Sequence, residues 1–246
     1  MGAETNIGWT GATWNPWQGC HHLSSGCDHC YMFTEKRRYG QDPTRVHRSS
    51  DATFYAPLRW QREVQSGKRT GRDRLVFTCS WSDWWINEAD VWRDDAWCVI
   101  RRCPDLIFQT LTKRPQRIAK HLPDYWEEIR DRVWLGISAE NQEEYDTRRQ
   151  FVDYSLSDKW WWSLEPILGL IDLRLQEYAR KPLWIVVGGE SGPNYWQCEI
   201  SWIRSVVEQC QEAGVPVFVK QDSGFKSEMQ GRIPSDLWAV KELPSS

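Results

Sequence analysis

The stretch Leu183–Gly192, LWIVVGGESG, passes from five apolar residues directly into two glycines, a glutamate and a serine. An uninterrupted apolar run, as opposed to an alternating one, is typical of a parallel strand that is buried on both faces. The polar residues that follow it would lie at the carboxyl end of that strand. The stretch therefore predicts one strand of a parallel α/β fold.

The same pattern recurs along the chain. Further runs occupy residues 74–83, 105–115, 132–141, 159–168 and 215–222, and another strand is expected near residues 6–15. Candidate helices lie between the runs, over 94–103 and over 200–214, where Gly214 is the expected stop. Strands that alternate with helices predict a parallel sheet with right-handed crossovers. We expect residues 1–246 to form a single α/β domain, a full or partial (β/α) barrel.

In such barrels the ligands bind at the carboxyl ends of the strands. The polar residues that end the six runs should therefore converge on one mouth. They are Ser80 and Asp83, Thr112 and Lys113, Ser138 and Glu140, Glu165, residues 188–191, and Lys220 with Gln221.

Residues 19–31, GCHHLSSGCDHCY, hold three cysteines and three histidines and follow the first expected strand. A disulfide would leave one of Cys20, Cys27 and Cys30 without a partner. A [4Fe-4S] cluster held by three thiolates would leave one iron open for a substrate or cofactor. A zinc site would need a fourth ligand, so Cys₃His zinc, completed by one of the histidines, is the alternative.

The other cysteines, at positions 79, 98, 103, 198 and 210, are scattered and suggest no disulfide framework. The sequence has no apolar run of about eighteen residues, and MGAETNIGWTG lacks the regions of a signal peptide. We therefore expect a soluble protein in a reducing compartment, the cytoplasm, with no membrane partner.

The net charge of -3 conceals a basic segment. Residues 36–74 carry eleven Lys or Arg against four Asp or Glu, and we expect them to form a basic aromatic insertion. The segment would track phosphates while Phe54, Tyr55 or Trp60 stacks on bases. The alternative is a solvated helix and loop.

Tryptophan occurs eighteen times. Most of these side chains should pack in the core, because strands and amphipathic helices accommodate large aromatic rings readily. A surplus of indoles around a cavity would also suit a flat ligand such as a nucleobase.

Seven motifs occur in this order: WNPWQGCHHLSSGCDHCY, FTCSWSD, FQTLTKRP, WLGISAEN, SLEPILG, VVGGESGP and GVPVFVKQ. Together they resemble the signatures of a phage-associated family that is related to radical S-adenosylmethionine (SAM) enzymes. The resemblance extends from about residue 7 to about residue 224. It implies a partial barrel of radical SAM type, with the cluster loop after the first strand, in the cytoplasm of a phage host. One departure is the spacing, since six residues separate Cys20 from Cys27 where the common pattern has three.

The resemblance also implies the cofactors and their ligands. Cys20, Cys27 and Cys30 would hold a [4Fe-4S] cluster, and the amine and carboxylate of SAM would bind its fourth iron. One electron, from a donor such as flavodoxin or ferredoxin, would then cleave SAM to a 5′-deoxyadenosyl radical.

The other polar residues that end the runs would then bind the different parts of SAM, assigned by their chemistry and by the order of the strands. Ser80 and Asp83 would accept the SAM ammonium, and Lys113 or Arg114 would bind its carboxylate. Ser138 and Glu140 would bind the ribose, and Gly188 and Gly189, followed by Glu190, would approach the adenine. Glu165 and Lys220 are left as candidate catalytic residues that meet the substrate.

Two of these assignments have simpler alternatives. Glu165 and Lys220 would form an ion pair inside the barrel, and the GGES segment would be a turn with Ser191 as a helix N-cap.

Three functions follow. The first is a radical SAM enzyme, an isomerase or modifying enzyme for a hypermodified thymidine base in phage DNA. The second is a radical SAM enzyme that acts on a small metabolite or peptide. The third is a zinc-stabilised nucleic-acid-binding module without catalysis.

Overall fold

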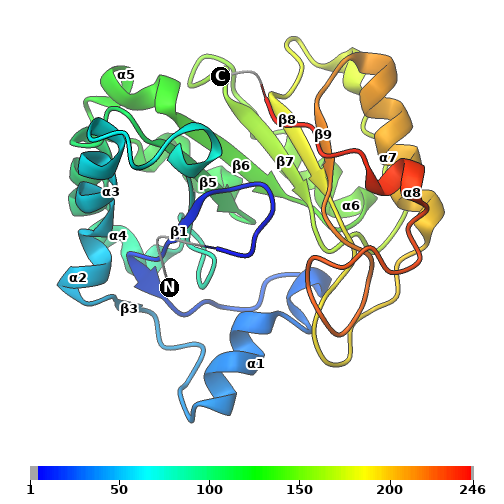
Figure 1. The fold of residues 1–246 in the computed structure, drawn as a ribbon, viewed down its shortest axis with the longest axis horizontal. Coiled ribbons are helices and arrows are strands. Elements are labelled where there is room, and N and C mark those ends of the chain that lie inside the picture. Colours follow the sequence, from blue (N-terminus) through cyan, green and yellow to red (C-terminus); the bar gives the residue numbers. More distant parts are fainter. Residues whose placement is uncertain (1–4, 245–246) are drawn as a thin grey trace. The chain divides into compact units, whose positions relative to one another are not determined.

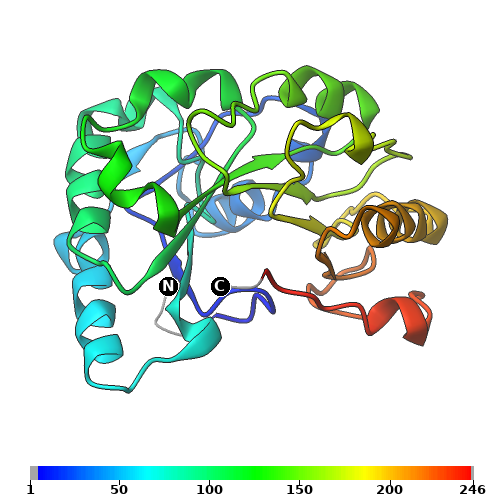
Figure 2. The same cartoon turned by 90° about the horizontal axis from the view of Figure 1, so that it is seen from above.

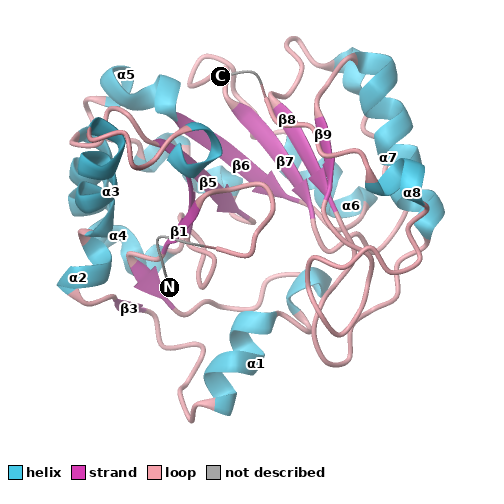
Figure 3. Cartoon of the chain, viewed as in Figure 1, coloured by secondary structure: helices cyan, strands magenta, loops and turns pink. Residues whose placement is uncertain are grey.

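The computed structural model describes residues 5–244 and contains seven strands of one sheet (Figures 1 and 3). They are β1 (Ala12–Trp14), β4 (Leu75–Thr78), β5 (Ile107–Thr112), β6 (Val133–Ser138), β7 (Trp160–Leu164), β8 (Trp184–Val187) and β9 (Val217–Val219). Their hydrogen-bonded order is β1-β4-β5-β6-β7-β8-β9. Pairing is parallel from β1 to β5 and from β7 to β9.

Every strand of this seven-stranded sheet lies inside a run that the sequence predicts, so the parallel α/β fold is confirmed. The strand order is open, with β1 at one end and β9 at the other. Within residues 5–244 this order fits a partial barrel, and the expectation of a full barrel is wrong. Continuous burial explains why the runs are not alternating, since every residue of β4, β6, β7, β8 and β9 is buried.

The chain divides into two compact units. The first unit comprises the chain up to His21 together with Met32–Gly136, and the second comprises His22–Tyr31 together with Ile137 onward. The helices of the first are α1 (Tyr31–Arg38), α2 (Asp51–Phe54), α3 (Ala56–Gln65), α4 (Asp90–Arg101) and α5 (Trp126–Ile129), beside the antiparallel pair β2 (Trp17–Gln18) and β3 (His47–Arg48). The helices of the second are α6 (Gln142–Arg149), α7 (Ile200–Ala213) and α8 (Ser235–Trp238).

Tryptophan rings fill the core of the first unit. Trp84 contacts Trp17 at 4.9 Å and Trp97 at 5.0 Å between ring centroids. Some of the buried indole N–H groups have carbonyl partners: Trp17 donates to Asp83 O and Trp97 donates to His121 O. The prediction that most tryptophans pack in the core is therefore confirmed.

In the second unit, α7 packs on β8 and β9 (Figure 2). Its buried side chains include Ile203, Val206 and Cys210, which recur at helical spacing. The helix ends at Gly214, as predicted, because this residue adopts a φ of 66°, a conformation that favours glycine.

The basic segment 36–74 folds as α1, β3, α2 and α3 with their connections. Two of its proposed stacking residues are inaccessible, because Phe54 and Trp60 are buried in the first unit. Their assignment as base-stacking residues is wrong, and Tyr55 alone of the three is exposed. Some basic side chains of the segment form hydrogen bonds within the protein. Lys36, for example, is buried and donates to Gln18 and Gln41.

No helix among residues 5–244 is both long and apolar enough to cross a membrane.

Candidate functional site

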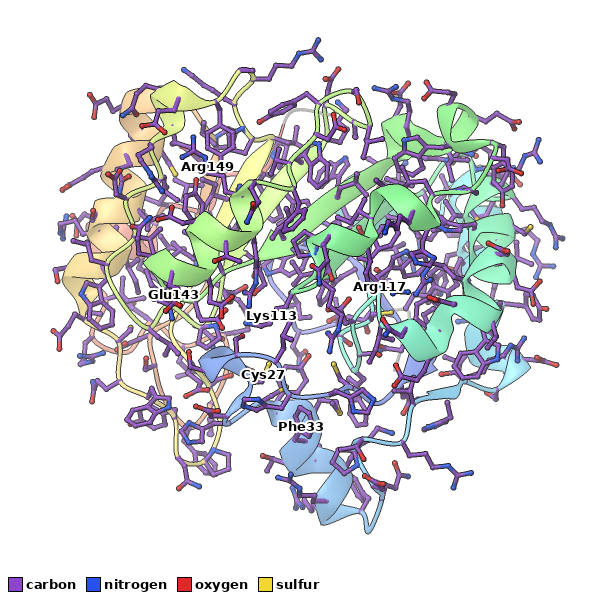
Figure 4. The ribbon with its side chains drawn as sticks, turned by 180° about the vertical axis from the view of Figure 1, so that it is seen from behind. Cys27, Phe33, Lys113, Arg117, Glu143 and Arg149 are labelled. Carbon is purple, nitrogen blue, oxygen red and sulfur yellow. The ribbon has the colours of Figure 1, made fainter. Side chains whose placement is uncertain are left out.

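The cysteine segment 19–31 is shared by the two units: Gly19, Cys20 and His21 belong to the first, and residues 22–31 to the second. Cys27 lies in a 3-10 turn, Ser25–Cys27, that precedes α1 (Figure 4). Within the described residues none of the three cysteines forms a disulfide, and all three are half-buried.

Gly19 joins the first part of this segment to the loop after β4. Its N–H donates to Trp81 O at 3.0 Å, and its carbonyl accepts from Ser82 Oγ at 2.6 Å. The residue adopts a φ of 94°, and a Cβ would lie 2.5 Å from Arg45 O. Only glycine fits here, so the backbone next to Cys20 is fixed.

Arg114, which follows β5, reaches the same part of the segment. Its Nη1 lies 2.9 Å from Asp83 Oδ2 and 3.9 Å from Cys20 Sγ, and its Nη2 donates to His21 O at 3.1 Å. Burial by itself would lower the pKa of Arg114, but the charges of Asp83 and Cys20 raise it. A fixed cation beside a thiol favours the thiolate, which is the metal-binding form.

Asp83 joins the ends of β4 and β5. Its Oδ1 accepts from Trp85 N and Thr112 Oγ1, and its Oδ2 accepts from Lys113 N and Arg114 Nη1, all within 3.0 Å. Four donors match the lone pairs of a carboxylate. Asp83 is therefore the residue that orients Arg114; its predicted contact with the SAM ammonium stays a prediction.

Cys79 and Ser80 form the bend between β4 and Asp83. Cys79 adopts a φ of 56°, which is rare for a residue other than glycine. The bend brings Ser80 Oγ within 3.0 Å of Asn15 Nδ2, while Asn15 Oδ1 accepts from Trp81 N. Burial raises the pKa of the Cys79 thiol well above its usual range.

In the second unit, Glu140 and Arg148 hold the segment that carries Cys27. Gly26 N donates to Glu140 Oε1 at 3.2 Å. Arg148 Nη1 donates to Glu140 Oε2 at 2.9 Å, and its Nη2 donates to Ser24 Oγ at 3.1 Å. Glu140 is completely buried, and both of its carboxylate oxygens accept hydrogen bonds, one from Gly26 and one from Arg148. Its predicted contact with ribose stays a prediction.

Glu190, which follows β8, holds the segment at a second point. Its Oε2 lies 3.0 Å from His29 Nδ1 and accepts from Trp196 N at 2.6 Å. The carboxylate is buried. The sequence analysis assigned Glu190 to the cofactor. In the structure Glu190 contacts His29, which lies between Cys27 and Cys30 in the sequence.

Glu165 and Lys220 form an ion pair, with 3.0 Å between Lys220 Nζ and Glu165 Oε1. Ser163 Oγ donates to Glu165 Oε2, and Ser138 Oγ donates to Glu165 O, each at 3.2 Å. Burial alone would lower the pKa of Lys220, but the carboxylates of Glu165 and Glu228 raise it. The ion-pair interpretation is confirmed, and the tails of β6, β7 and β9 meet here.

Gly188 and Gly189 have close neighbours. A Cβ on Gly189 would lie 2.3 Å from Ser223 N, and one on Gly188 would lie 3.1 Å from Glu165 Oε1. Ser191 is not a helix N-cap, because α7 begins at Ile200 and its N-cap is Glu199. Both glycines are thus explained by packing, and their contact with adenine stays a prediction.

The histidines of the segment also have carboxylate partners. His21 contacts Glu88 and His22 contacts Asp28, each at 2.6 Å. Among residues 5–244 no group of three or more His, Cys, Asp or Glu side chains is arranged to hold a metal ion. Cysteine thiols outside any disulfide, here with a cation beside one of them, are the donor type that iron–sulfur clusters use.

Sequence reasoning missed the residues that support this segment: Asn15, Ser24, Arg148 and Trp196. Asn15 and Ser24 lie inside the first of the seven motifs, and Arg148 and Trp196 lie in none of them. Each of the four contacts a residue far away in the chain. Arg148 alone had a signal, since it lies at helical spacing from Glu144, with which it also pairs.

A family model described as "Protein of unknown function (DUF5131)" matches residues 4–237. Neither the curated proteins nor the solved structures yielded a match. Because the matched region covers nearly the whole sequence, the chain belongs to the DUF5131 family.

Proposed function

We propose that this chain is a radical SAM enzyme that binds a [4Fe-4S] cluster through Cys20, Cys27 and Cys30, and that it modifies or isomerises a thymidine-derived base in DNA. One observation carries the proposal. Each part of the cysteine segment is fixed to the carboxyl ends of parallel strands: Arg114 reaches Cys20 and His21, and Glu140 reaches Gly26. That edge is where α/β proteins of this type bind ligands.

The residues of the chain divide into two roles. When bound, the cluster and SAM supply a 5′-deoxyadenosyl radical for hydrogen abstraction. The Arg114 guanidinium lies beside the Cys20 sulfur, where a positive charge favours a thiolate ligand, and Arg148 with Glu140 orients the backbone before Cys27. The proposed contacts of SAM are still Lys113, Ser80, Ser138 and the two glycines that follow β8, Gly188 and Gly189.

The ion pair is the proposed contact with the substrate. The Lys220 ammonium holds a proton that it can donate, and Glu165 Oε1 can accept one. Ser163 and Ser138 keep the glutamate in place through its side chain and its backbone.

The test is anaerobic reconstitution with iron and sulfide, followed by metal analysis and visible spectroscopy. The parent should turn brown and bind about four irons per chain. Cys20→Ala, Cys27→Ala and Cys30→Ala should each lose most of the iron. Cys98→Ala is the matched control, because Cys98 is exposed and lies outside the segment.

A zinc-stabilised module is the second candidate. The observation that favours it is the carboxylate beside each histidine of the segment, since metal-binding histidines commonly donate their second ring N–H to such a partner. Stoichiometric zinc without iron after the same treatment would replace the first candidate with this one.

A further inference from the structure

Trp196 differs from every other tryptophan of the chain. All eighteen lie within the described residues, and Trp196 is the exposed one, with 55% of its surface accessible. Burial of an indole stabilises a fold, so an exposed indole on an ordered loop is unusual.

The loop holds Trp196 against the cysteine segment. The backbone N–H of Trp196 donates to the buried Glu190 carboxylate at 2.6 Å. Its ring lies 5.5 Å from the imidazole of His29, between ring centroids, with 36° between the planes. Since Glu190 also contacts His29, one carboxylate binds both the His29 ring and the backbone of Trp196. Trp196 is therefore an ordered aromatic ring next to the residues that flank Cys27 and Cys30.

A second loop contributes to the same surface. Gly224 N donates to Glu190 O and Gly192 N donates to Gly224 O, both at 3.0 Å, so the loops after β8 and β9 run side by side. Tyr195 is exposed on the first loop, and Phe225 and Lys226 are exposed on the second. Exposed aromatic rings with a nearby cation are typical of surfaces on which nucleobases stack.

We propose that Trp196 stacks on a pyrimidine base of the substrate, presented either in single-stranded DNA or extruded from a duplex. The inference rests on the proposed function, because it places the base beside the cysteine segment. A base has a flat apolar face and polar edges. The loop that carries Trp196 also exposes the polar residues Asn194 and Gln197, which suit the polar edges of a base. The buried positions of Phe54 and Trp60 leave this surface as the better stacking site.

The experiment uses a fluorescein-labelled thymine oligonucleotide and measures its affinity by anisotropy, with competition by free thymidine. Trp196→Ala should weaken oligonucleotide binding about tenfold to a hundredfold, the usual loss for one base–aromatic stack. Trp196→Phe should restore most of the affinity, because it keeps a flat ring. Phe151→Ala is the matched control, since Phe151 is an exposed aromatic residue just beyond α6.

Iron content and cleavage of SAM without substrate are measured on the same variants. Unchanged affinity in Trp196→Ala overturns the stacking inference while leaving the proposed radical chemistry intact. Loss of affinity in a protein that binds no iron supports the stacking site and overturns the radical function. Failure of the parent to bind either probe also overturns the inference, and a protein partner then becomes the better occupant of this surface. If Trp196→Ala weakens the binding of free thymidine as much as that of the oligonucleotide, the result supports stacking and identifies a nucleoside as the substrate.

Discussion

The guanidinium of Arg114 lies 3.9 Å from the sulfur of Cys20 and 2.9 Å from the carboxylate of Asp83. Asp83 thus fixes the arginine that faces the thiol. The same guanidinium also donates to His21 O, so it binds both the side chain and the backbone of the segment.

Replacing Arg114 with alanine should make Cys20 less reactive in the metal-free protein. Without the cation the thiolate is less favoured, so alkylation by iodoacetamide at about pH 7.5 should slow several-fold. Peptide mass spectrometry measures the rate at Cys20 and at Cys98. Cys98 is the internal control, and an equal change at both cysteines would indicate a general structural effect. Arg114→Lys should recover part of the rate, because it keeps the charge but loses the two-pronged contact.

Replacing Glu140 with alanine should destabilise the second unit. The change leaves the guanidinium of Arg148 buried with only part of its partners, a loss that typically costs about 3–5 kcal/mol. Urea unfolding followed by circular dichroism measures it. Glu143→Ala is the matched control, since Glu143 is exposed on α6 (Figure 4) and should change the free energy of unfolding by less than about 0.5 kcal/mol. Equal effects in both variants would contradict the anchoring role.

The sequence predicts the strands of this fold well because buried parallel strands have a local signature. WIVV in β8 is a continuous apolar run and WWWSL in β7 is interrupted only by Ser163. The polar residues that follow these strands mark the edge at which α/β proteins of this type bind ligands. Gly214 is a local signal as well, since the end of a helix needs a residue that tolerates positive φ.

The partners of the tail residues are not local. Glu140 binds Gly26, which is 114 positions away, and Glu190 binds His29, which is 161 positions away. Strand order places both carboxylates at the correct edge but does not say that they support the cysteine segment. The same limit explains the error at Phe54 and Trp60: charge density marks a surface, but side-chain packing decides which rings are exposed.

Asp222 should make stability fall in acid. Burial alone would raise its pKa, but hydrogen bonds from Arg232 and from the N–H groups of Arg232 and Ser223 hold the pKa below its ordinary value. The charged carboxylate therefore stabilises the fold above the pKa of an unfolded aspartate, about 3.9. This contribution is lost as the pH falls from there through the lower folded-state pKa.

Urea unfolding of Asp222→Asn at pH 7, 5, 4 and 3 measures that contribution. The variant should be less stable than the parent at pH 7, and the difference should shrink toward pH 3. Asp95→Asn is the control, because Asp95 is exposed on α4 and should leave the pH dependence as in the parent. A constant difference between Asp222→Asn and the parent at all four pH values would contradict the linkage.

Gln109 should be a site of stabilising substitution. It is completely buried in β5, and neither its amide nitrogen nor its amide oxygen has a hydrogen-bond partner among the described residues. A buried unpaired polar group typically costs about 1–3 kcal/mol, so Gln109→Leu should raise the free energy of unfolding by a similar amount. Thermal and urea unfolding measure the gain. No gain would indicate that buried water satisfies the amide in solution.

Charge reversal in the basic segment tests whether the substrate is polymeric DNA. Arg62 and Lys68 are both exposed, so they are free to meet phosphates. In the double variant Arg62→Glu, Lys68→Glu, DNA affinity should fall, and the dependence of log affinity on log salt should become shallower by about 0.9 for each phosphate that the protein no longer neutralises. The proposed reductive cleavage of SAM should be unchanged, because the proposal assigns it to the cysteine segment and not to residues 36–74. Arg102→Glu with Lys120→Glu is the matched control, since both residues are exposed cations outside the segment. Normal turnover in the first variant would identify 36–74 as a solvated face and favour the alternative in which the substrate is a small metabolite or peptide.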